Sequence, residues 1–297
     1  MSGIAVIGLG AMGGGMARAC LRAGLEVLGV DMDKAREEAF RAEGGMAGDI
    51  ASRGAGLDAV VLVTVNAAQV EDALFGPAGV APHLRKGAVA VACATMAPDQ
   101  ARALAARAAE AGLLWLDAPI SGGAAKAAAG KLSILASGPA EAFAAARPAL
   151  DAMAETVFEL GDEPGAGSAM KAINQMLVGV HIAAAAEAIT FGMTQGVAPE
   201  KTLEVISRCA GASWALENRG PHIAKGDYAP LSAVDIWLKD LGIVLDIAAR
   251  AKFSAPLTAA ALQQYMAASG SGLGREDDAA VAKVYARNAG LTLPGDA

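Results

Sequence analysis

The sequence has little of several residue types on which whole classes of proteins depend. It holds three cysteines and three histidines. They form no C-x-x-C pair and no H-E-x-x-H motif, so we expect neither a disulfide framework nor a metal site. Basic residues number 24, against 31 acidic ones. Because phosphate contacts dominate nucleic-acid affinity, an acidic chain without a dense Lys/Arg run is not expected to bind nucleic acid.

Signals for export and for membrane insertion are also missing. The chain enters a strand-like segment at residue 3, without a basic leader or an apolar stretch that ends in a cleavage site. The most apolar later segment, residues 176–186, contains His181 and is followed by Glu187. It is too short to span a bilayer, so we predict a cytoplasmic protein without a membrane partner.

The plentiful residues indicate a large core. Apolar residues make up 54% of the 297, a length that suits about two domains. In the first half, short apolar runs alternate with amphipathic ones, which is typical of a mostly parallel, doubly wound α/β sheet of the Rossmann type. The predicted strands are residues 4–7, 26–31, 59–65, 88–93, 113–117, 132–137 and 156–160, and the predicted helices include residues 13–23, 98–111 and 140–153.

The chain changes character at residues 161–167, which are rich in glycine and acidic residues. Beyond them strand signals almost vanish. We therefore predict a Rossmann domain over residues 1–163 and an all-α domain over residues 164–297. An apolar helix such as residues 176–186 needs cover on all sides, which in so small a domain predicts that a second copy of the chain supplies part of it in a homo-oligomer. The predicted helices of this part are residues 168–196, 199–209, 233–251 and 256–269.

A dinucleotide-binding fingerprint follows the first predicted strand. This G-x-G-x-x-G string consists of Gly8, Leu9, Gly10, Ala11, Met12 and Gly13. Its glycines allow a tight turn, the approach of a pyrophosphate and close packing of the helix, whose N-terminus attracts phosphates. The string predicts a bound dinucleotide.

Asp31 ends the second predicted strand, where the fingerprint expects an acidic residue. Its carboxylate can accept hydrogen bonds from the ribose hydroxyls and would repel a 2′-phosphate. No arginine follows directly, since the next residues are Met32, Asp33 and Lys34, so we predict NAD rather than NADP. The alternative is a glycine turn beside a surface aspartate.

A glycine-rich segment begins at Asp117, where the fifth predicted strand ends. Ser121 offers a hydroxyl, and Gly122 and Gly123 offer unobstructed backbone N–H groups. Such a turn can hold a carboxylate, and open α/β sheets bind ligands at this end of their strands. The alternative is an ordinary glycine-rich loop.

Lys171 and Asn174 lie three residues apart at the start of the most apolar predicted helix, so they share one helix face. Desolvation would lower the pKa of such a lysine and make it a usable general base. The alternative is a lysine whose ammonium reaches solvent from the helix end. Ser168 and Lys171 also spell S-x-x-K, a serine hydrolase signature, but its S-D-N and K-T-G partner strings are missing.

Lys239 lies inside another apolar helical pattern and could supply a second positive charge near the substrate or cofactor. The alternative is an exposed pair of Lys239 with Asp240 on a helix surface. Three further polar residues could contact the substrate: His181, His222 and Asn218. Of these, His181 is predicted to be a satisfied core histidine, because it lies on an apolar helix.

Four motifs in register carry a resemblance that spans nearly the whole chain: GLGAMG, DAPISGG, GAGSAMKAIN and KDL. They resemble the β-hydroxyacid dehydrogenases, which include 3-hydroxyisobutyrate dehydrogenase and tartronate semialdehyde reductase. The resemblance implies that Lys171 is the catalytic acid/base and that Lys239 lies near the site. It further implies that the substrate is bound by Ser121, Gly122, Gly123 and Asn174, and that Val65, Asn66 and Thr95 line the cofactor side.

Longer stretches, such as VNAAQVEDALFG and SWALENRGPHIAKGDY, resemble in particular the L-threonate dehydrogenases of this family. They imply NAD-dependent oxidation of a small anionic hydroxy acid, here L-threonate to 2-oxotetronate. The alternative reactions are those of 3-hydroxyisobutyrate dehydrogenase and tartronate semialdehyde reductase. A different alternative is a nucleotide-sensing protein that keeps the fold without turnover.

Overall fold

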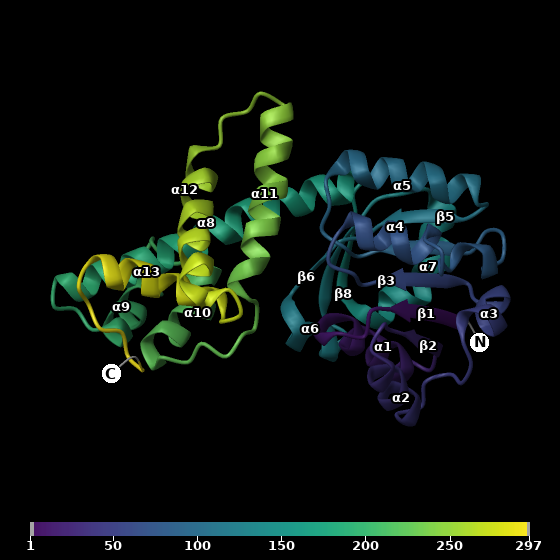
Figure 1. Ribbon diagram of the computed structural model, residues 1–297, viewed down its shortest axis with the longest axis horizontal. Coiled ribbons are helices and arrows are strands. Elements are labelled where there is room, and N and C mark those ends of the chain that lie inside the picture. Colours follow the sequence, from purple (N-terminus) through teal and green to yellow (C-terminus); the bar gives the residue numbers. More distant parts are fainter. Residues whose placement is uncertain (1–2, 296–297) are drawn as a thin grey trace. The chain divides into compact units, whose positions relative to one another are not determined.

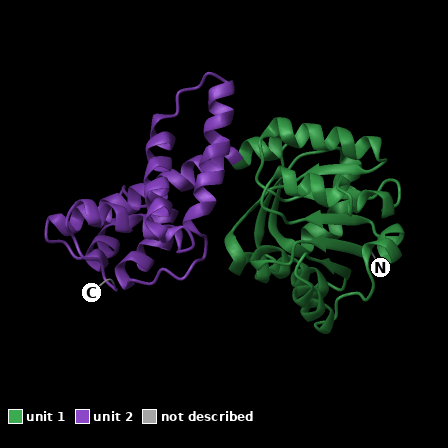
Figure 2. Ribbon diagram, in the orientation of Figure 1, with its two compact units in different colours: residues 1–171 green, residues 172–297 purple. Residues whose placement is uncertain are grey.

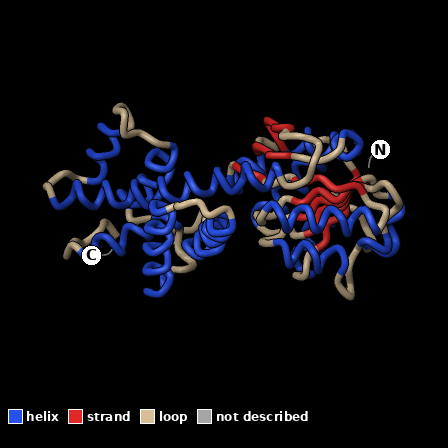
Figure 3. Tube along the Cα trace, turned by 90° about the horizontal axis from the view of Figure 1, so that it is seen from above, coloured by secondary structure: helices blue, strands red, loops and turns tan. Residues whose placement is uncertain are grey.

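A computed structural model describes residues 3–295 (Figure 1). The chain forms two compact units, residues 1–171 and 172–297 (Figure 2). Every named strand belongs to the first unit, and the described part of the second consists of helices and loops (Figure 3). The predicted fold class, a Rossmann domain followed by an all-α domain, is confirmed. The division of the chain falls inside a helix, and the boundary after residue 163 stays a prediction.

The main sheet has five parallel strands in the order β2-β1-β3-β4-β5. These strands are β1 (Gly3–Ile7), β2 (Glu26–Val30), β3 (Ala59–Leu62), β4 (Val89–Ala92) and β5 (Leu114–Asp117). They are the five strands predicted for the first half, although β3 ends three residues before the predicted end. Because β1 lies between β2 and β3, successive strands are added on one side of β1 and then on the other. Open α/β sheets bind ligands at the carboxyl ends of the strands where this reversal of strand order occurs.

Helices cover both faces of this sheet. Alternate residues of β1 point to opposite faces, so that Ile4 and Val6 join one apolar cluster and Ala5 and Ile7 join the other. The first cluster includes side chains of α1 and α7, and the second includes side chains of α4 and α5. The helices that accompany this sheet on its two faces are α1 (Ala11–Arg22), α2 (Lys34–Ala42), α3 (Ile50–Arg53), α4 (Ala67–Phe75), α5 (Pro98–Glu110) and α7 (Ala140–Met153).

A smaller sheet follows in the same unit. Its order is β6-β7-β8, with β6 antiparallel and β8 parallel to β7. The bounds are β6 (Ile120–Ser121), β7 (Leu132–Ala136) and β8 (Ala154–Glu159), and α6 (Gly123–Ala129) follows β6. Strands β7 and β8 were predicted. Strand β6 was not, because two residues are too short to show an alternating pattern.

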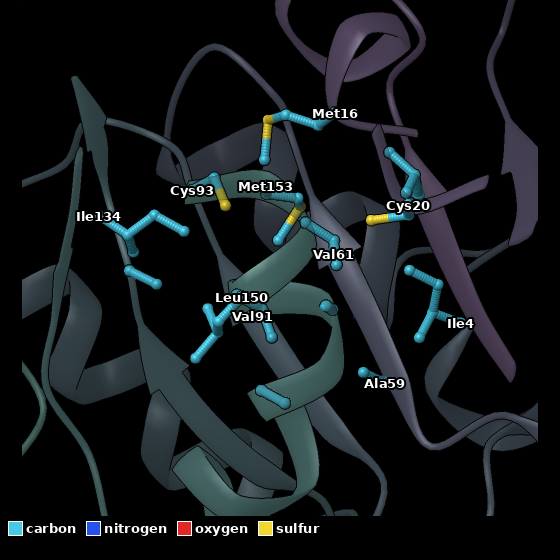
Figure 4. Close-up of a cluster of buried hydrophobic side chains, with 14 of the residues drawn as sticks. Ile4, Met16, Cys20, Ala59, Val61, Val91, Cys93, Ile134, Leu150 and Met153 are labelled. Atoms are coloured by element: carbon cyan, nitrogen blue, oxygen red, sulfur yellow. The ribbon is translucent and has the colours of Figure 1, made fainter. Parts of the chain in front are cut away.

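The core of the first unit buries two of the three cysteines. Cys20 and Cys93 both lie in the cluster between α1, α7 and the sheet (Figure 4). Burial raises the pKa of each thiol to about 12. Both are therefore protonated at neutral pH and shielded from reagents, whereas Cys209 in the second unit is exposed.

This difference predicts one reactive thiol in the native protein. Dithionitrobenzoate at neutral pH should react quickly with Cys209 alone, because thiolate is the reactive form and the two buried thiols lack both access and charge. All three thiols should react after unfolding in denaturant. The control is Cys209→Ser, which should abolish the fast phase. Two or more fast thiols in the native wild type would contradict this packing.

The second unit packs its helices around an aromatic pair. Trp237 and Tyr265 stack with ring centroids 5.7 Å apart, and the Tyr265 hydroxyl donates to the carbonyl oxygen of Gly179 at 2.9 Å. Helices α10 and α13 were not predicted. The helices are α8 (Ala166–Thr194), which begins in the first unit, α9 (Pro199–Ile206), α10 (Trp214–Lys225), α11 (Val234–Arg250), α12 (Pro256–Ala268) and α13 (Val281–Asn288).

Helix α8 is long and apolar enough to cross a membrane by length and composition, a test that core helices of soluble proteins also pass. One side of it is buried in the core of the second unit through Ile182 and Ile189. Another side leaves Leu177 and Phe191 more than half exposed. His181 is exposed as well, so the prediction of a core histidine is wrong. This chain therefore covers α8 on part of its circumference only.

Candidate active site

The turn between β1 and α1 has the shape that a dinucleotide requires. Gly8 adopts φ +93°, and a Cβ placed there would lie 2.4 Å from the carbonyl oxygen of Val63. A Cβ on Gly13 would lie 1.8 Å from the carbonyl oxygen of Gly8. Side chains are therefore excluded from both positions. A Cβ on Gly10 would have a single neighbour within 4 Å, the Arg36 guanidinium at 3.7 Å, so the backbone here stays open to approach.

The N-terminus of α1 follows this turn directly. Gly10 is its N-cap and supplies no side-chain hydrogen bond, and Ala11 and Met12 form the first turn. The N–H groups of a helix start that has no side-chain cap remain available to an anion, and the helix dipole adds a favourable field. The residues present thus fit the pyrophosphate of a dinucleotide.

Asp31 lies directly after β2 and is tied to the glycine turn. Its Oδ2 accepts a hydrogen bond from the backbone N–H of Leu9 at 2.6 Å, and its Oδ1 accepts one from Asp33 at 2.9 Å. The carboxylate therefore holds the turn in place, and its remaining lone pairs are the acceptors that ribose hydroxyls require.

Arg36 is a neighbour that the sequence analysis missed. Its Nη1 lies 3.8 Å from Oδ2 of Asp31, and its Nε lies 3.3 Å from Oδ2 of Asp33. The residues immediately after Asp31 include no arginine, but the first turn of α2 brings the Arg36 guanidinium back toward the end of β2. The predicted adenosine end of the site thus contains a cation as well as the carboxylate.

The residues after β3 and β4 lie at the same edge of the parallel sheet as the glycine turn. Asn66 caps α4, and its side-chain oxygen accepts a hydrogen bond from Gln69 at 2.9 Å. Val65 donates its backbone N–H to the Gln69 side chain at 2.9 Å and is half exposed. Thr95, after β4, is partly buried. Asn66 therefore has a structural role that accounts for its position without a cofactor.

The predicted catalytic amine lies against the strand that carries Ser121. Lys171 is 8% exposed, and its Nζ donates a hydrogen bond to the carbonyl oxygen of Ile120 at 2.9 Å. Ser121 is the next residue. Gly122 and Gly123 follow with φ of +137° and +77° and expose their backbone to solvent. The alternative of an ammonium that reaches solvent is wrong, and two of the predicted site segments are neighbours.

A buried clamp fixes the start of α8 and hence Lys171. Asp117 accepts hydrogen bonds from the backbone N–H groups of Gly165 at 3.0 Å and Ser168 at 2.8 Å, and from the Ser168 hydroxyl at 2.7 Å. Burial raises the pKa of Asp117, and these hydrogen bonds oppose that rise. Ser168 is 1% exposed and bonded to a carboxylate, so the serine hydrolase alternative has no accessible nucleophile.

In the second unit, a chain of contacts connects the other two predicted substrate residues. Asn174 donates through Nδ2 to Oε1 of Gln175 at 2.9 Å, and Gln175 donates through Nε2 to Oδ2 of Asp240 at 2.5 Å. Lys239 Nζ lies 2.6 Å from Oδ1 of Asp240. Asp240 is 3% exposed, so the alternative of an exposed Lys–Asp pair is wrong. The sequence offered no signal for the role of Gln175.

Comparison with known proteins decides the family. One family model, described as the NAD binding domain of 6-phosphogluconate dehydrogenase, matches residues 3–161. A second, described as NAD-binding of NADP-dependent 3-hydroxyisobutyrate dehydrogenase, matches residues 165–285. An L-threonate dehydrogenase from Cupriavidus necator is 51% identical over 295 residues, which cover 99% of this chain and 98% of that protein. The chain belongs to the β-hydroxyacid dehydrogenase family.

Solved structures of this family have the same fold. A 3-hydroxyisobutyrate dehydrogenase from Salmonella typhimurium is 43% identical and superposes with a TM-score of 0.89, covering 96% of this chain and 100% of that one. A 3-hydroxyisobutyrate dehydrogenase from Mycobacterium tuberculosis, solved with L-serine, is 29% identical with a TM-score of 0.85, covering 96% and 99%. This β-hydroxyacid dehydrogenase is an NAD-dependent enzyme, and its glycine turn lies inside the region that the first NAD-binding model matches.

Two further polar residues of the dehydrogenase have local partners in the second unit. His222 Nδ1 lies 2.8 Å from the carbonyl oxygen of Asp227. The Asn218 side-chain oxygen accepts a hydrogen bond from Arg219, which is buried and ion-paired with Asp278 at 2.5 Å. These contacts stabilise α10 and the segment after it. Among residues 3–295, no group of three or more His, Cys, Asp or Glu side chains is placed to hold a metal ion.

Proposed function

We propose that this chain oxidises L-threonate to 2-oxotetronate with NAD as the hydride acceptor. The observation that carries the chemistry is the buried amine of Lys171, held on the Ile120 carbonyl beside Ser121. The choice of substrate is supported by 51% identity over nearly the full length to a protein named L-threonate dehydrogenase. The Salmonella structure named 3-hydroxyisobutyrate dehydrogenase, at 43% identity, supports the second candidate substrate.

The proposed roles follow from the donors and acceptors of each residue. The substrate carboxylate binds the Ser121 hydroxyl and the backbone N–H groups of Gly122 and Gly123, which are exposed and carry no side chain. Asn174 hydrogen-bonds the reacting hydroxyl, and Lys239 contributes positive charge near the anionic substrate and the cofactor. In its neutral form, Lys171 takes the hydroxyl proton while the C–H bond breaks, and in the reverse reaction it returns that proton.

The proposed cofactor contacts lie at one edge of the parallel sheet. The turn and helix start of Gly8, Leu9, Gly10, Ala11, Met12 and Gly13 hold the pyrophosphate. Asp31 accepts hydrogen bonds from the adenosine ribose. Val65, Asn66 and Thr95, which follow β3 and β4, lie on the nicotinamide side.

We also propose self-association as a homodimer or homotetramer in the cytoplasm. The support is the uncovered side of α8, where the large apolar side chains of Ile173, Leu177 and Phe191 are each more than half exposed. Exposed apolar surface on one continuous helix costs free energy in water, and a second copy of the same face would remove it.

A substrate panel tests the proposed function. Purified enzyme with NAD should form NADH fastest from L-threonate, and more slowly from D-erythronate, 3-hydroxyisobutyrate and D-glycerate. Absorbance of NADH gives kcat/KM for each acid. A larger kcat/KM for 3-hydroxyisobutyrate would replace L-threonate by the second candidate. NAD binding without NADH formation from any acid of the panel would favour a nucleotide sensor.

A further inference from the structure

A buried carboxylate of α11 determines how two polar side chains of α8 can be oriented. Asp240 is 3% exposed, and a carboxylate only accepts hydrogen bonds. Its Oδ2 is 2.5 Å from the Gln175 side chain. Gln175 must therefore present its NH2 group to Asp240, which turns its carbonyl oxygen away from the carboxylate.

The same argument extends one residue further, to Asn174. The Gln175 carbonyl oxygen accepts a hydrogen bond from Asn174 Nδ2 at 2.9 Å. An acceptor at this position requires that Asn174 turns its NH2 group toward Gln175. The groups of Asn174 that remain for a ligand are then its carbonyl oxygen and one amide hydrogen. The Asn174 amide could otherwise adopt two orientations, with its oxygen and its nitrogen exchanged. The Asp240 carboxylate selects one of them through Gln175.

Burial makes this orientation stable. Gln175 is 8% exposed, so rotating its amide would place carbonyl oxygen against carboxylate in surroundings with little water to replace the lost hydrogen bonds. The other oxygen of Asp240 lies 2.6 Å from Lys239 Nζ. One carboxylate thus holds both residues of the second unit that the proposed function assigns to substrate or cofactor.

We propose that Gln175 and Asp240 are positioning residues of the dehydrogenase, which fix the Asn174 amide so that its remaining amide hydrogen donates to the oxygen of the substrate hydroxyl, whose proton goes to Lys171. The inference rests on the proposed function, because it takes Asn174 as a substrate contact. Neither Gln175 nor Asp240 needs to touch the substrate. Their effect on the reaction passes through Asn174 and, for Asp240, also through Lys239.

A double-mutant cycle tests the coupling between Gln175 and Asn174. Gln175→Met keeps the length of the side chain and removes both hydrogen bonds. It should lower kcat/KM for the hydroxy acid by roughly three- to a hundredfold, the range expected for coupled neighbours. KM for NAD should not change. Asn174→Ala should lower kcat/KM as well, and adding Gln175→Met to Asn174→Ala should have little further effect, because the residue through which Gln175 acts is already gone.

Two further variants separate positioning from general damage to α8. Asp240→Asn keeps the volume and can still bond Gln175, but its amide can donate, so the fixed polarity is lost. It should also lower kcat/KM for the acid, which keeps the proposal testable should Gln175→Met not fold. The matched control is Thr190→Val, since the buried Thr190 hydroxyl bonds within α8 to the Ala186 carbonyl at 2.8 Å. It should leave kcat/KM unchanged.

The outcomes distinguish this inference from the proposed function. An impaired Asn174→Ala enzyme, together with a harmless Gln175→Met or with losses that multiply in the double variant, would overturn the positioning role alone. An Asn174→Ala enzyme with wild-type kcat/KM would overturn both the positioning role and the assignment of Asn174 to the substrate. The positioning role is supported if Gln175→Met lowers kcat/KM for the hydroxy acid at unchanged KM for NAD, and if adding it to Asn174→Ala lowers kcat/KM little further.

Discussion

Replacing Lys171 with alanine is expected to lower turnover by at least about a hundredfold, because general acid–base assistance is typically worth a hundred- to ten-thousandfold. The amine is buried and lies 2.9 Å from the Ile120 carbonyl, next to the Ser121 turn. Its loss removes the proposed acceptor of the hydroxyl proton. NAD binding should persist, since the glycine turn and Asp31 do not depend on this side chain. Steady-state turnover and calorimetric titration with NAD measure the two effects separately.

Charge and proton transfer at residue 171 can be told apart. Lys171→Arg keeps a positive charge, but a guanidinium does not lose its proton in proteins. We expect it to be nearly as inactive as Lys171→Ala, whereas an enzyme that needs only the charge would keep activity. The matched control is Lys131→Ala, which removes an exposed lysine of the same unit and should leave turnover unchanged. Near-normal turnover in Lys171→Ala would refute the proposed role.

The parts of this molecule that the sequence predicts are those set by local rules. The turn at Gly8 and Gly13 is recognisable because Gly8 adopts a positive φ and because the Gly8 carbonyl oxygen, in the same turn, excludes a side chain at Gly13. Lys171 stands out because a charged residue in an apolar helix is unusual. In both places the pattern of neighbouring residues contains the reason for the structure.

The parts that the sequence does not predict depend on contacts between distant segments. Asp117 clamps the start of α8 across 51 residues, and Gln175 reaches Asp240 across 65. Neither pairing leaves a periodic signal, since a single polar residue in an apolar run has many conceivable partners. The contact of Arg36 with Asp31 was missed although the two residues are close in the sequence, because Arg36 approaches Asp31 only after the chain has turned into α2.

The second large effect concerns the choice between NAD and NADP, in which we expect Asp31 and Arg36 to act together. Asp31→Asn keeps the shape of the side chain and removes its charge. We expect kcat/KM with NAD to fall roughly ten- to a hundredfold, because a hydrogen bond to a charged group is worth about 1.5–3 kcal/mol. With NADP, the repulsion of a 2′-phosphate would disappear. The Arg36 guanidinium, now 3.8 Å from Asp31, would become available to that phosphate.

The decisive quantity is therefore the ratio of kcat/KM for NAD to that for NADP. Asp33→Asn is the matched control. This exposed carboxylate also contacts Arg36, at 3.3 Å, and caps α2, where asparagine caps equally well. The ratio should stay near the wild-type value in the control and fall in Asp31→Asn. Adding Arg36→Ala to Asp31→Asn should then remove the gain with NADP. An unchanged ratio in Asp31→Asn would mean that the carboxylate acts only on the Leu9 N–H, as a support of the glycine turn.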